Sequence, residues 1–217
     1  MTLVEKENVL FEEWKKGRDD FVSDGVVDEN AYAKSVKKLI FVLKEVNFAD
    51  ENRDLRKFLR DRNERPQTWD NVTRWVMGIR RLKDDLPWVD LENIDQEKRI
   101  ETLKSICAVN LRKSPGGYTS DNKRLKVVAK EDKNYIEGQI LLYDADLIIC
   151  CGVGDLFKGI ISFGKSFQWT NTKRGIPFCE FAPGRFIVSY SHPEARIQDN
   201  VLYYGLLDAI REIYKVI

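Results

Sequence analysis

Four short apolar runs stand out along the chain. Each is rich in β-branched residues, lacks the alternation of a half-exposed strand and is typical of a strand buried on both faces of a sheet. We therefore predict strands near residues 39–43 (LIFVL), 105–109 (SICAV), 147–151 (LIICC) and 186–189 (FIVS).

Between these runs, apolar residues recur at the three-to-four-residue spacing of amphipathic helices. Such patterns occupy residues 54–62, 69–82, 135–143 and 199–217. Asp199 or Asn200 is the expected N-cap of the last helix. Because strands and helices alternate, we predict a three-layer α/β fold with a central four-stranded parallel sheet and helices on both faces.

At 217 residues, the chain is long enough to bury a sizeable core in a single domain. Within residues 1–217 we expect a helical N-terminal cap over 1–36 and a core over 37–217. Two stretches, 113–126 and 164–185, are rich in loop-forming residues and read as long loops, and a hairpin could form in the second.

The formal charge of +1 hides local imbalance. Basic residues gather in 53–81 and 112–130, whereas acidic residues gather in 5–13 and 84–101. Separated charge of this kind can form a basic face that attracts nucleic acid. A solvated surface without a partner is the alternative interpretation.

Several classes of protein do not fit the sequence. Glu and Lys interrupt the N-terminal apolar runs, so we expect no signal peptide, and no apolar stretch approaches the length of a membrane span. The four cysteines lack the C-x-x-C spacing of zinc or iron–sulfur sites. We expect buried thiols in a reducing compartment, with neither metal nor cofactor.

Three polar residues and a glycine follow the four predicted strands. Glu45 comes after the first strand, Asn110 after the second, Gly152 after the third and His192, the single histidine, after the fourth. Ligands of open α/β sheets bind beyond the carboxyl ends of the strands, so these residues mark a candidate site.

Each of these residues also has a purely structural interpretation. Glu45 could pair with a nearby arginine, and Asn110 could simply turn the chain. Gly152 belongs to a strand-to-helix turn that lacks the full dinucleotide fingerprint. A histidine before proline, such as His192, is more often structural than catalytic.

Three segments in this order carry a resemblance: FVLKEVNF (41–48), CAVNLRKS (107–114) and SHPEARI (191–197). Together they resemble the uracil-DNA glycosylase superfamily, of which the chain would be a distant member. Proteins of that superfamily carry a catalytic loop after the first strand, an Asn after a later strand and a His-Pro-Ser-type motif after the last. The resemblance covers roughly residues 37–215 and implies the fold predicted above.

The resemblance also implies roles. The family's first motif reads G-Q-D-P-Y or G-E-x-P-G in several branches, and here Val46 stands in place of its water-activating Asp. Glu45 would then be the best replacement and Asn47 the second. His192 would stabilise negative charge on the departing base.

The base pocket implied by the resemblance has three members. Asn110 would read the edge of the flipped base, Phe48 would stack on it or gate its 5-position, and Gly152 would complete the pocket. In place of the family's leucine wedge, Arg196 or Ile197 would enter the helix.

Phosphate clamps are expected from the basic stretches 53–65, 112–126 and 173–185. The candidate DNA-binding residues are Arg112, Lys113, Lys173, Arg174 and Arg196.

These inferences predict a monomeric DNA glycosylase of the bacterial cytosol that acts in repair or anti-phage defence. Its target would be uracil or a modified pyrimidine, for instance glucosylated hydroxymethylcytosine in viral DNA. Two alternatives remain: a nucleic-acid-binding module of the same fold that has lost catalysis, and an enzyme that acts on free nucleosides or nucleotides.

Overall fold

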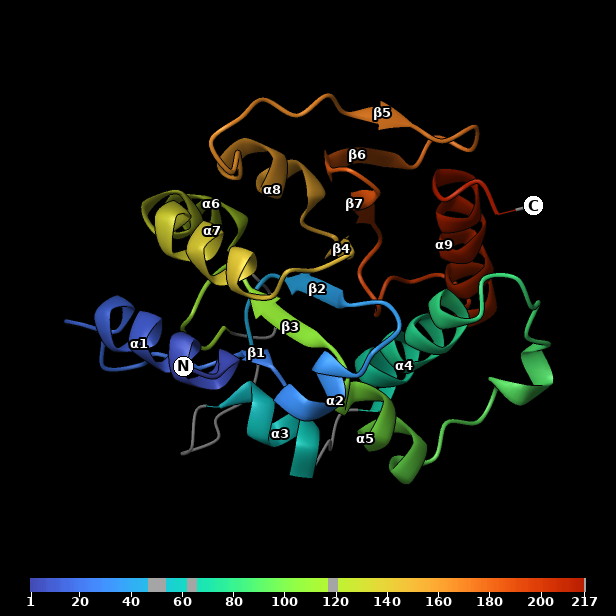
Figure 1. The fold of residues 1–217 in the computed structure, drawn as a ribbon, viewed down its shortest axis with the longest axis horizontal. Helices are drawn as coiled ribbons and strands as arrows, with labels where there is room; N and C mark the ends of the chain where they lie inside the picture. The colour runs from blue at the N-terminus through green and yellow to red at the C-terminus, as the bar shows by residue number, and fades with distance from the viewer. Residues whose placement is uncertain (47–53, 62–65, 117–120, 217) are drawn as a thin grey trace.

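The fold is a mixed α/β arrangement around one seven-stranded sheet (Figure 1). The computed structural model describes residues 1–46, 54–61, 66–116 and 121–216. The strands follow the order β1-β3-β2-β4-β7-β6-β5 across the sheet. Their bounds are β1 Gly25–Val26, β2 Leu39–Leu43, β3 Cys107–Asn110, β4 Leu147–Cys151, β5 Thr170–Asn171, β6 Pro177–Ala182 and β7 Arg185–Tyr190.

The strands expected from the four apolar runs are β2, β3, β4 and β7, and they are neighbours in the sheet. β2 pairs in parallel with β3 and β4, and β4 pairs in parallel with β7. The sheet is nevertheless larger and more mixed than the four-stranded parallel sheet predicted from the sequence. β1 adds an antiparallel strand beside β3, and β6 and β5 add two antiparallel strands beyond β7.

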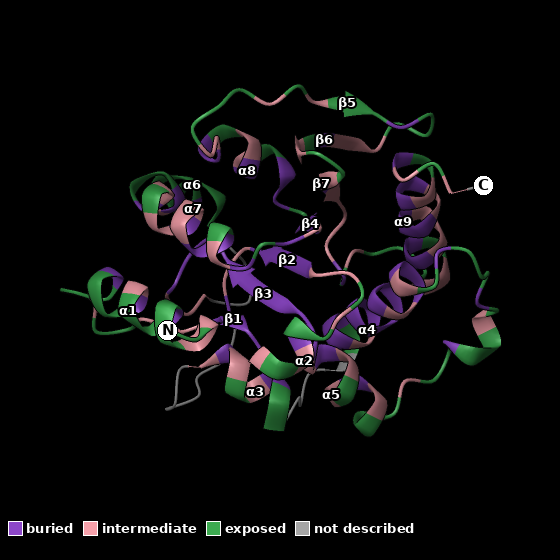
Figure 2. Cartoon of the chain, in the orientation of Figure 1, coloured by how far each residue is buried: buried purple, intermediate pink, exposed green. Residues whose placement is uncertain are grey.

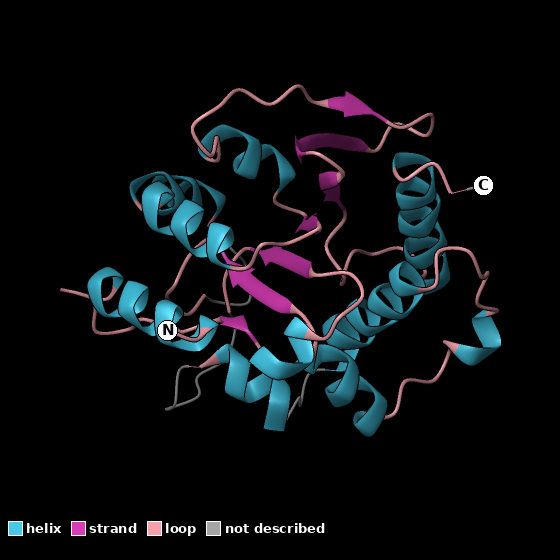
Figure 3. Ribbon diagram, in the orientation of Figure 1, coloured by secondary structure: helices cyan, strands magenta, loops and turns pink. Residues whose placement is uncertain are grey.

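Helices cover both faces of the sheet (Figure 3). Apolar side chains of α3, α4, α5 and α9 pack on one face, and those of α1, α2, α6, α7 and α8 pack on the other. The helix bounds are α1 Leu3–Trp14, α2 Glu29–Ala33, α3 Leu55–Asp61, α4 Pro66–Arg80, α5 Gln96–Lys104, α6 Asn122–Glu131, α7 Lys133–Leu142, α8 Gly154–Ile160 and α9 Asp199–Ile213, with a short 3₁₀ turn, η1, at Trp88–Asp90.

Burial on both faces explains why the β2 run shows no alternation. Leu39 and Phe41 belong to the core of one face, whereas Ile40 and Val42 belong to the core of the other. All four side chains are fully buried, and β2 and β3 are drawn in the colour of buried residues at the centre of Figure 2. An unbroken apolar run is the expected pattern for such a strand.

The N-terminal segment is more than the helical cap predicted for residues 1–36. α1 begins with a capping box in which Thr2 and Glu5 bond each other's backbone. After it, Gly25 and Val26 form an edge strand of the sheet. Gly25 has φ +114°, and a Cβ there would lie 2.1 Å from Glu7 Oε1, so the strand and α1 meet where a side chain has no room.

Two expected loops contain regular structure. Asp121 caps α6 by accepting from the backbone of Lys123 and Arg124, so the helix takes up the end of the stretch 113–126. The stretch 164–185 contains β5 and β6, so a hairpin does form there. The last helix begins at Asp199 after Gln198, and neither expected N-cap residue occupies the N-cap position.

Candidate functional site

Strand register brings the ends of the predicted strands into one row. Leu43 of β2 pairs with Asn110 of β3, and Cys151 of β4 pairs with Tyr190 of β7. The β2–β4 ladder is in step with both, since Val42 pairs with Cys150. Asn110 and the residues just after the other three strands, Glu45, Gly152 and His192 among them, therefore lie along the carboxyl edge of the sheet.

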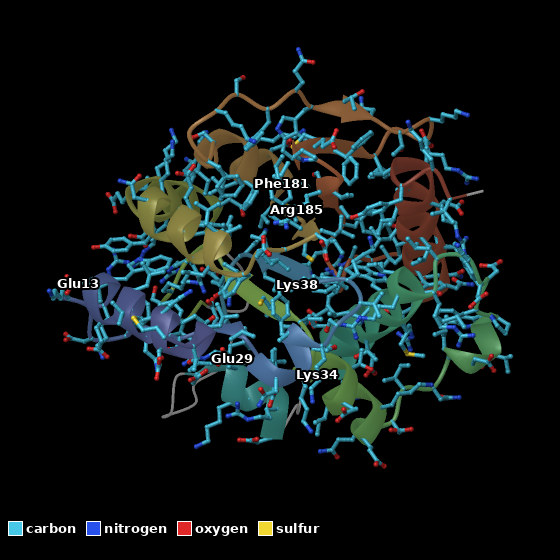
Figure 4. The ribbon with its side chains drawn as sticks, in the orientation of Figure 1. Glu13, Glu29, Lys34, Lys38, Phe181 and Arg185 are labelled. Carbon is cyan, nitrogen blue, oxygen red and sulfur yellow. The ribbon has the colours of Figure 1, made fainter. Side chains whose placement is uncertain are left out.

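Two basic residues lie at the opposite, amino edge of the sheet. Lys38 directly precedes β2, and Arg185 is the first residue of β7; both are labelled near the centre of Figure 4. Both pair with Asp144. The two edges are thus chemically distinct, and the residues of the candidate site share one of them.

His192 lies against the turn that follows β4. A Cβ on Gly152, which has φ +70°, would lie 3.2 Å from His192 Cβ. The backbone N–H of Gly152 donates to the carbonyl oxygen of Tyr190 at 2.8 Å. A glycine is required here both by the left-handed backbone and by the close approach of the histidine.

The protonation of His192 is defined by its surroundings. Burial lowers the pKa of the imidazole below its usual 6.5, the Lys44 ammonium lowers it further, and the Glu194 carboxylate opposes both effects. Nδ1 accepts the backbone N–H of Glu194 at 3.1 Å. The ring is therefore neutral at pH 7, with its proton on Nε2, which makes Nε2 a hydrogen-bond donor.

Helix α4 holds the segment that carries this histidine. Asn71 Nδ2 donates to the Pro193 carbonyl oxygen at 2.8 Å and to Asp199 Oδ1 at 2.9 Å. Arg74 pairs with the same Asp199 carboxylate, and Thr68 donates to Glu194. Both ends of the segment 193–199 are tied to one rigid helix, so the position of His192 is fixed.

Glu45 has the structural partner that its alternative interpretation required. Arg112 Nη1 donates to Glu45 Oε2 at 2.8 Å, and both side chains are almost completely buried. A Cβ on Gly116 would lie 2.3 Å from Glu45 Oε1, so the loop backbone covers the other oxygen. This geometry argues against the predicted role of Glu45 in orienting water and against the predicted contact of Arg112 with phosphate.

Asn110 is held by a carboxylate that the sequence analysis did not identify. Asp24 Oδ2 accepts from the backbone N of Asn110 at 2.7 Å and from its Nδ2 at 3.1 Å. Asp24 Oδ1 accepts from Lys113 Nζ at 2.5 Å and from Gln139 Nε2 at 2.8 Å. Lys113 is completely buried and pairs with Asp24, which argues against its predicted contact with DNA.

The buried network continues into α1. Tyr143, which accepts from Gln139, donates to Glu7 Oε1 at 2.5 Å, and Arg56 Nη1 donates to Glu7 Oε2 at 2.9 Å. Burial raises the pKa of Glu7 above its usual 4.5, although Tyr143, Val26 and Arg56 oppose the rise. Residues from five parts of the chain thus fix the end of β3, and apart from the partly exposed Arg56 their side chains are buried.

A cleft of about 500 Å³ opens on the α6 and α8 side of the carboxyl edge. Lys44 and Lys126 contribute charge, and Gly152 links the cleft to His192. A Cβ on Gly154 would lie 1.8 Å from Ser189 Oγ, so a glycine is required where α8 packs on β7. The lining residues are Lys44, Asn122, Leu125, Lys126, Gly152, Val153, Gly154, Asp155, Leu156, Ser189 and Tyr190.

The remaining predicted DNA contacts are spread over the surface. Lys173 donates its backbone N–H to Glu212, and Arg174 pairs with Asp208, so both lie beside the C-terminal half of α9 and not at the cleft. Arg196 is exposed, and the adjacent Ile197 is 48% exposed, between His192 and the start of α9. Asn47 and Phe48 lie outside the described residues.

Among the described residues, no group of three His, Cys, Asp or Glu side chains is arranged to hold a metal ion. All four cysteines are free and buried, as predicted. No helix in the described part of the chain has the length and apolar character needed to cross a membrane.

Comparisons with known proteins supply no assignment: no family model matches the chain, and no curated protein matches it.

Asp24 and Lys44 were not among the predicted site residues, whereas Lys126 belongs to the basic stretch 112–126 from which phosphate contacts were expected. Asp24 lies in a stretch without periodicity, and its partner Asn110 is 86 positions away. Lys44 could have been identified, because it directly follows the first predicted strand.

Proposed function

We propose that the protein is a DNA N-glycosylase in which His192 donates a hydrogen bond to the departing base. The single observation that carries the proposal is the imidazole of His192 at the carboxyl edge, which lies beside the Gly152 turn and accepts the backbone N–H of Glu194 at Nδ1. Its Nε2–H is a donor that is left free by the bond at Nδ1.

Base excision needs such a donor. Cleavage of the bond between base and deoxyribose passes through a state with positive charge on the sugar, as in other sugar transfers. Negative charge develops on the leaving base, and a pre-positioned donor lowers the barrier. A neutral imidazole supplies such a donor through its protonated ring nitrogen.

The surface around His192 supports contact with an extruded nucleotide. Ile197 is half-exposed and follows the histidine by five positions, where an apolar side chain could fill the space left in the duplex. Arg196 is exposed beside it. Asn110 is only 2% exposed and its Nδ2 donates to Asp24, which argues against its predicted role as reader of the base edge.

The cleft bears on the choice of substrate. At about 500 Å³ it falls in the size range of sites for drug-sized ligands, more than an unmodified pyrimidine ring requires. We therefore favour a modified pyrimidine, such as glucosylated hydroxymethylcytosine in viral DNA, over uracil. A monomer in the bacterial cytosol, acting in anti-phage defence or base-excision repair, is the corresponding biological setting.

One observation favours a second candidate, a nucleic-acid-binding module without catalysis. Glu45 is neutralised by Arg112 and covered by Gly116, so the carboxylate that would orient water is already engaged. If the protein does catalyse excision, the water would then have to be oriented by Asn47, the second residue predicted to do so.

The test is an excision assay on a matched set of oligonucleotides that carry uracil, deaminated purines, methylated cytosine or glucosylated hydroxymethylcytosine. Alkali cleavage reports abasic sites, and free nucleosides serve as a further arm. We expect excision of a modified base by the wild type. His192→Ala should lower the rate by about 10²–10³-fold while DNA binding is retained.

Binding without excision of any base would replace the glycosylase by the binding module. Action on free nucleosides alone would favour the nucleoside-processing enzyme. Fast release of uracil with no action on modified bases would make the protein an ordinary repair glycosylase.

A further inference from the structure

The cleft beside His192 carries unpaired positive charge. Among the described residues, the hydrogen-bond acceptor of Lys44 Nζ is a neutral one, Asn122 Oδ1, at 3.2 Å. Lys126 lies one turn after Asn122 on α6, is exposed and has no carboxylate partner among the described residues. Two ammonium groups thus share one rim, and no carboxylate of the described part of the chain pairs with them.

The acidic residue of the cleft does not neutralise them. Asp155 is the single carboxylate among the lining residues that the structure describes. Its side chain is fully exposed and lies 3.8 Å from Lys158. Asp155 therefore has its own cation, and the rim formed by Lys44 and Lys126 keeps a net positive charge.

The inner wall of the cleft is different in character. Leu125 and Val153 are buried apolar residues of the lining, and Leu156 extends the same wall. Ser189 adds a hydroxyl group under Gly154. An apolar wall below a cationic rim matches a ligand with a flat or apolar part and an anionic group, as in a nucleotide.

We propose that this cleft binds a nucleoside phosphate, with Lys44 and Lys126 paired to its phosphate and the nucleoside against Leu125, Val153 and Leu156. The phosphate can belong to a DNA strand or to a free nucleotide, since both present the same anionic oxygens. The inference extends the proposed function but does not depend on it, because phosphate binding is measured without base excision.

The test compares Lys44→Met, Lys126→Met and the double variant with the wild type. The probes are thymidine 5′-monophosphate, thymidine, inorganic phosphate and a fluorescent oligonucleotide. Lys130→Met is the matched control, because Lys130 is an exposed lysine of the same helix that does not line the cleft. Thermal melting shows that each variant is folded, and Lys126→Arg tests whether charge alone suffices.

We expect each cleft variant to weaken binding of the monophosphate roughly two- to fivefold, and Lys130→Met to leave it unchanged. If the bound phosphate is part of a strand, each lost lysine should also reduce the salt dependence of oligonucleotide binding by about one phosphate contact. The NMR signal of the single histidine should shift when the phosphate binds next to Lys44.

The two sources of phosphate give different results. If the cleft variants lose binding of the monophosphate, of the oligonucleotide or of both, the site is supported. The probe whose binding is lost then identifies the source of the phosphate. Equal binding of thymidine and its monophosphate, or unchanged affinity in the folded double variant, would overturn the proposal. Either result can occur with or without base excision, so the proposed function is judged separately.

Discussion

The carboxylate of Asp24 holds Asn110 by two hydrogen bonds, one to its backbone N at 2.7 Å and one to its side-chain Nδ2 at 3.1 Å. The same carboxylate neutralises Lys113, whose side chain has no access to solvent. One buried group thus orients a candidate base-reading amide and pairs with a buried ammonium.

Asp24→Asn should therefore destabilise the protein by about 3–5 kcal/mol, because it leaves the Lys113 ammonium buried without a counterion. Urea unfolding measures the loss. The double variant Asp24→Asn/Lys113→Met should recover part of it, since the unpaired charge is then gone. Wild-type stability in the single variant would contradict this account of the network.

Asp24→Asn should also change how the free energy of unfolding depends on pH, and the wild type sets the reference. Burial lowers the pKa of Lys113 below 10.5, and the charge of Asp24 opposes that shift. Between the folded and unfolded pKa values the unfolded chain binds more protons, so stability rises with pH in this window. Without Asp24 the window should widen toward lower pH, and unfolding curves over a pH series would show it.

Gly154→Ala should destabilise the junction of α8 and β7, because the new Cβ would lie 1.8 Å from Ser189 Oγ. Ser189→Gly removes the obstructing atoms and should restore stability in the double variant. Gly159→Ala, on the same helix with nothing within 4 Å of the new Cβ, is the matched control. It should be neutral or stabilising by up to about 1 kcal/mol, and thermal melting compares the three.

The single histidine allows a direct titration. We expect an NMR pKa for His192 below 6.5, because burial is the largest of the effects on its ring. Lys44→Met should raise this pKa by removing a nearby positive charge, and Glu194→Gln should lower it by removing a negative one. Shifts in the opposite directions would contradict the geometry of the site.

The rate of base excision should follow the same titration. It should be constant above pH 6.5, where the ring is neutral, and should change as pH falls through the folded pKa. The histidine also contributes to stability. Because its folded pKa is depressed, stability should fall as pH drops from 6.5 through that value, and His192→Gln should remove this dependence.

Arg112→Met should affect stability and leave the salt dependence of DNA binding unchanged. Its guanidinium is almost completely buried on Glu45, and breaking a buried pair costs about 3 kcal/mol or more. Urea unfolding and a salt titration of oligonucleotide affinity test the two parts. A reduced salt dependence in the folded variant would return Arg112 to the DNA-binding surface.

The hydrophobic pattern predicts a strand correctly where consecutive residues are all buried between the two faces of the sheet. The run at 39–43 predicts β2 because all five of its residues are buried. It was insufficient for β1, since two residues carry no periodicity. It also missed α5, a mostly polar helix in which only Arg99 and Leu103 are buried.

The candidate site shows the same division. Topology alone predicts that Glu45, Asn110 and His192 share the carboxyl edge, because parallel strands end together. The partners of these residues follow from contacts between distant segments: Glu45 with Arg112 across 67 positions, and Asn110 with Asp24 across 86. No pattern of neighbouring residues identifies such partners, so Arg112 as the partner of Glu45 and the burial of Lys113 on Asp24 were not predicted.

The four buried thiols have a practical consequence. Burial raises the pKa of Cys107, Cys150 and Cys151 well above the usual 9, and that of Cys179 to about 11. Alkylating reagents attack thiolates, which these side chains do not form near neutral pH. A cysteine introduced at the exposed position 196 would thus be the fast-reacting thiol of the folded protein, so a fluorophore attached there could follow DNA engagement beside His192 in real time without removal of any native cysteine.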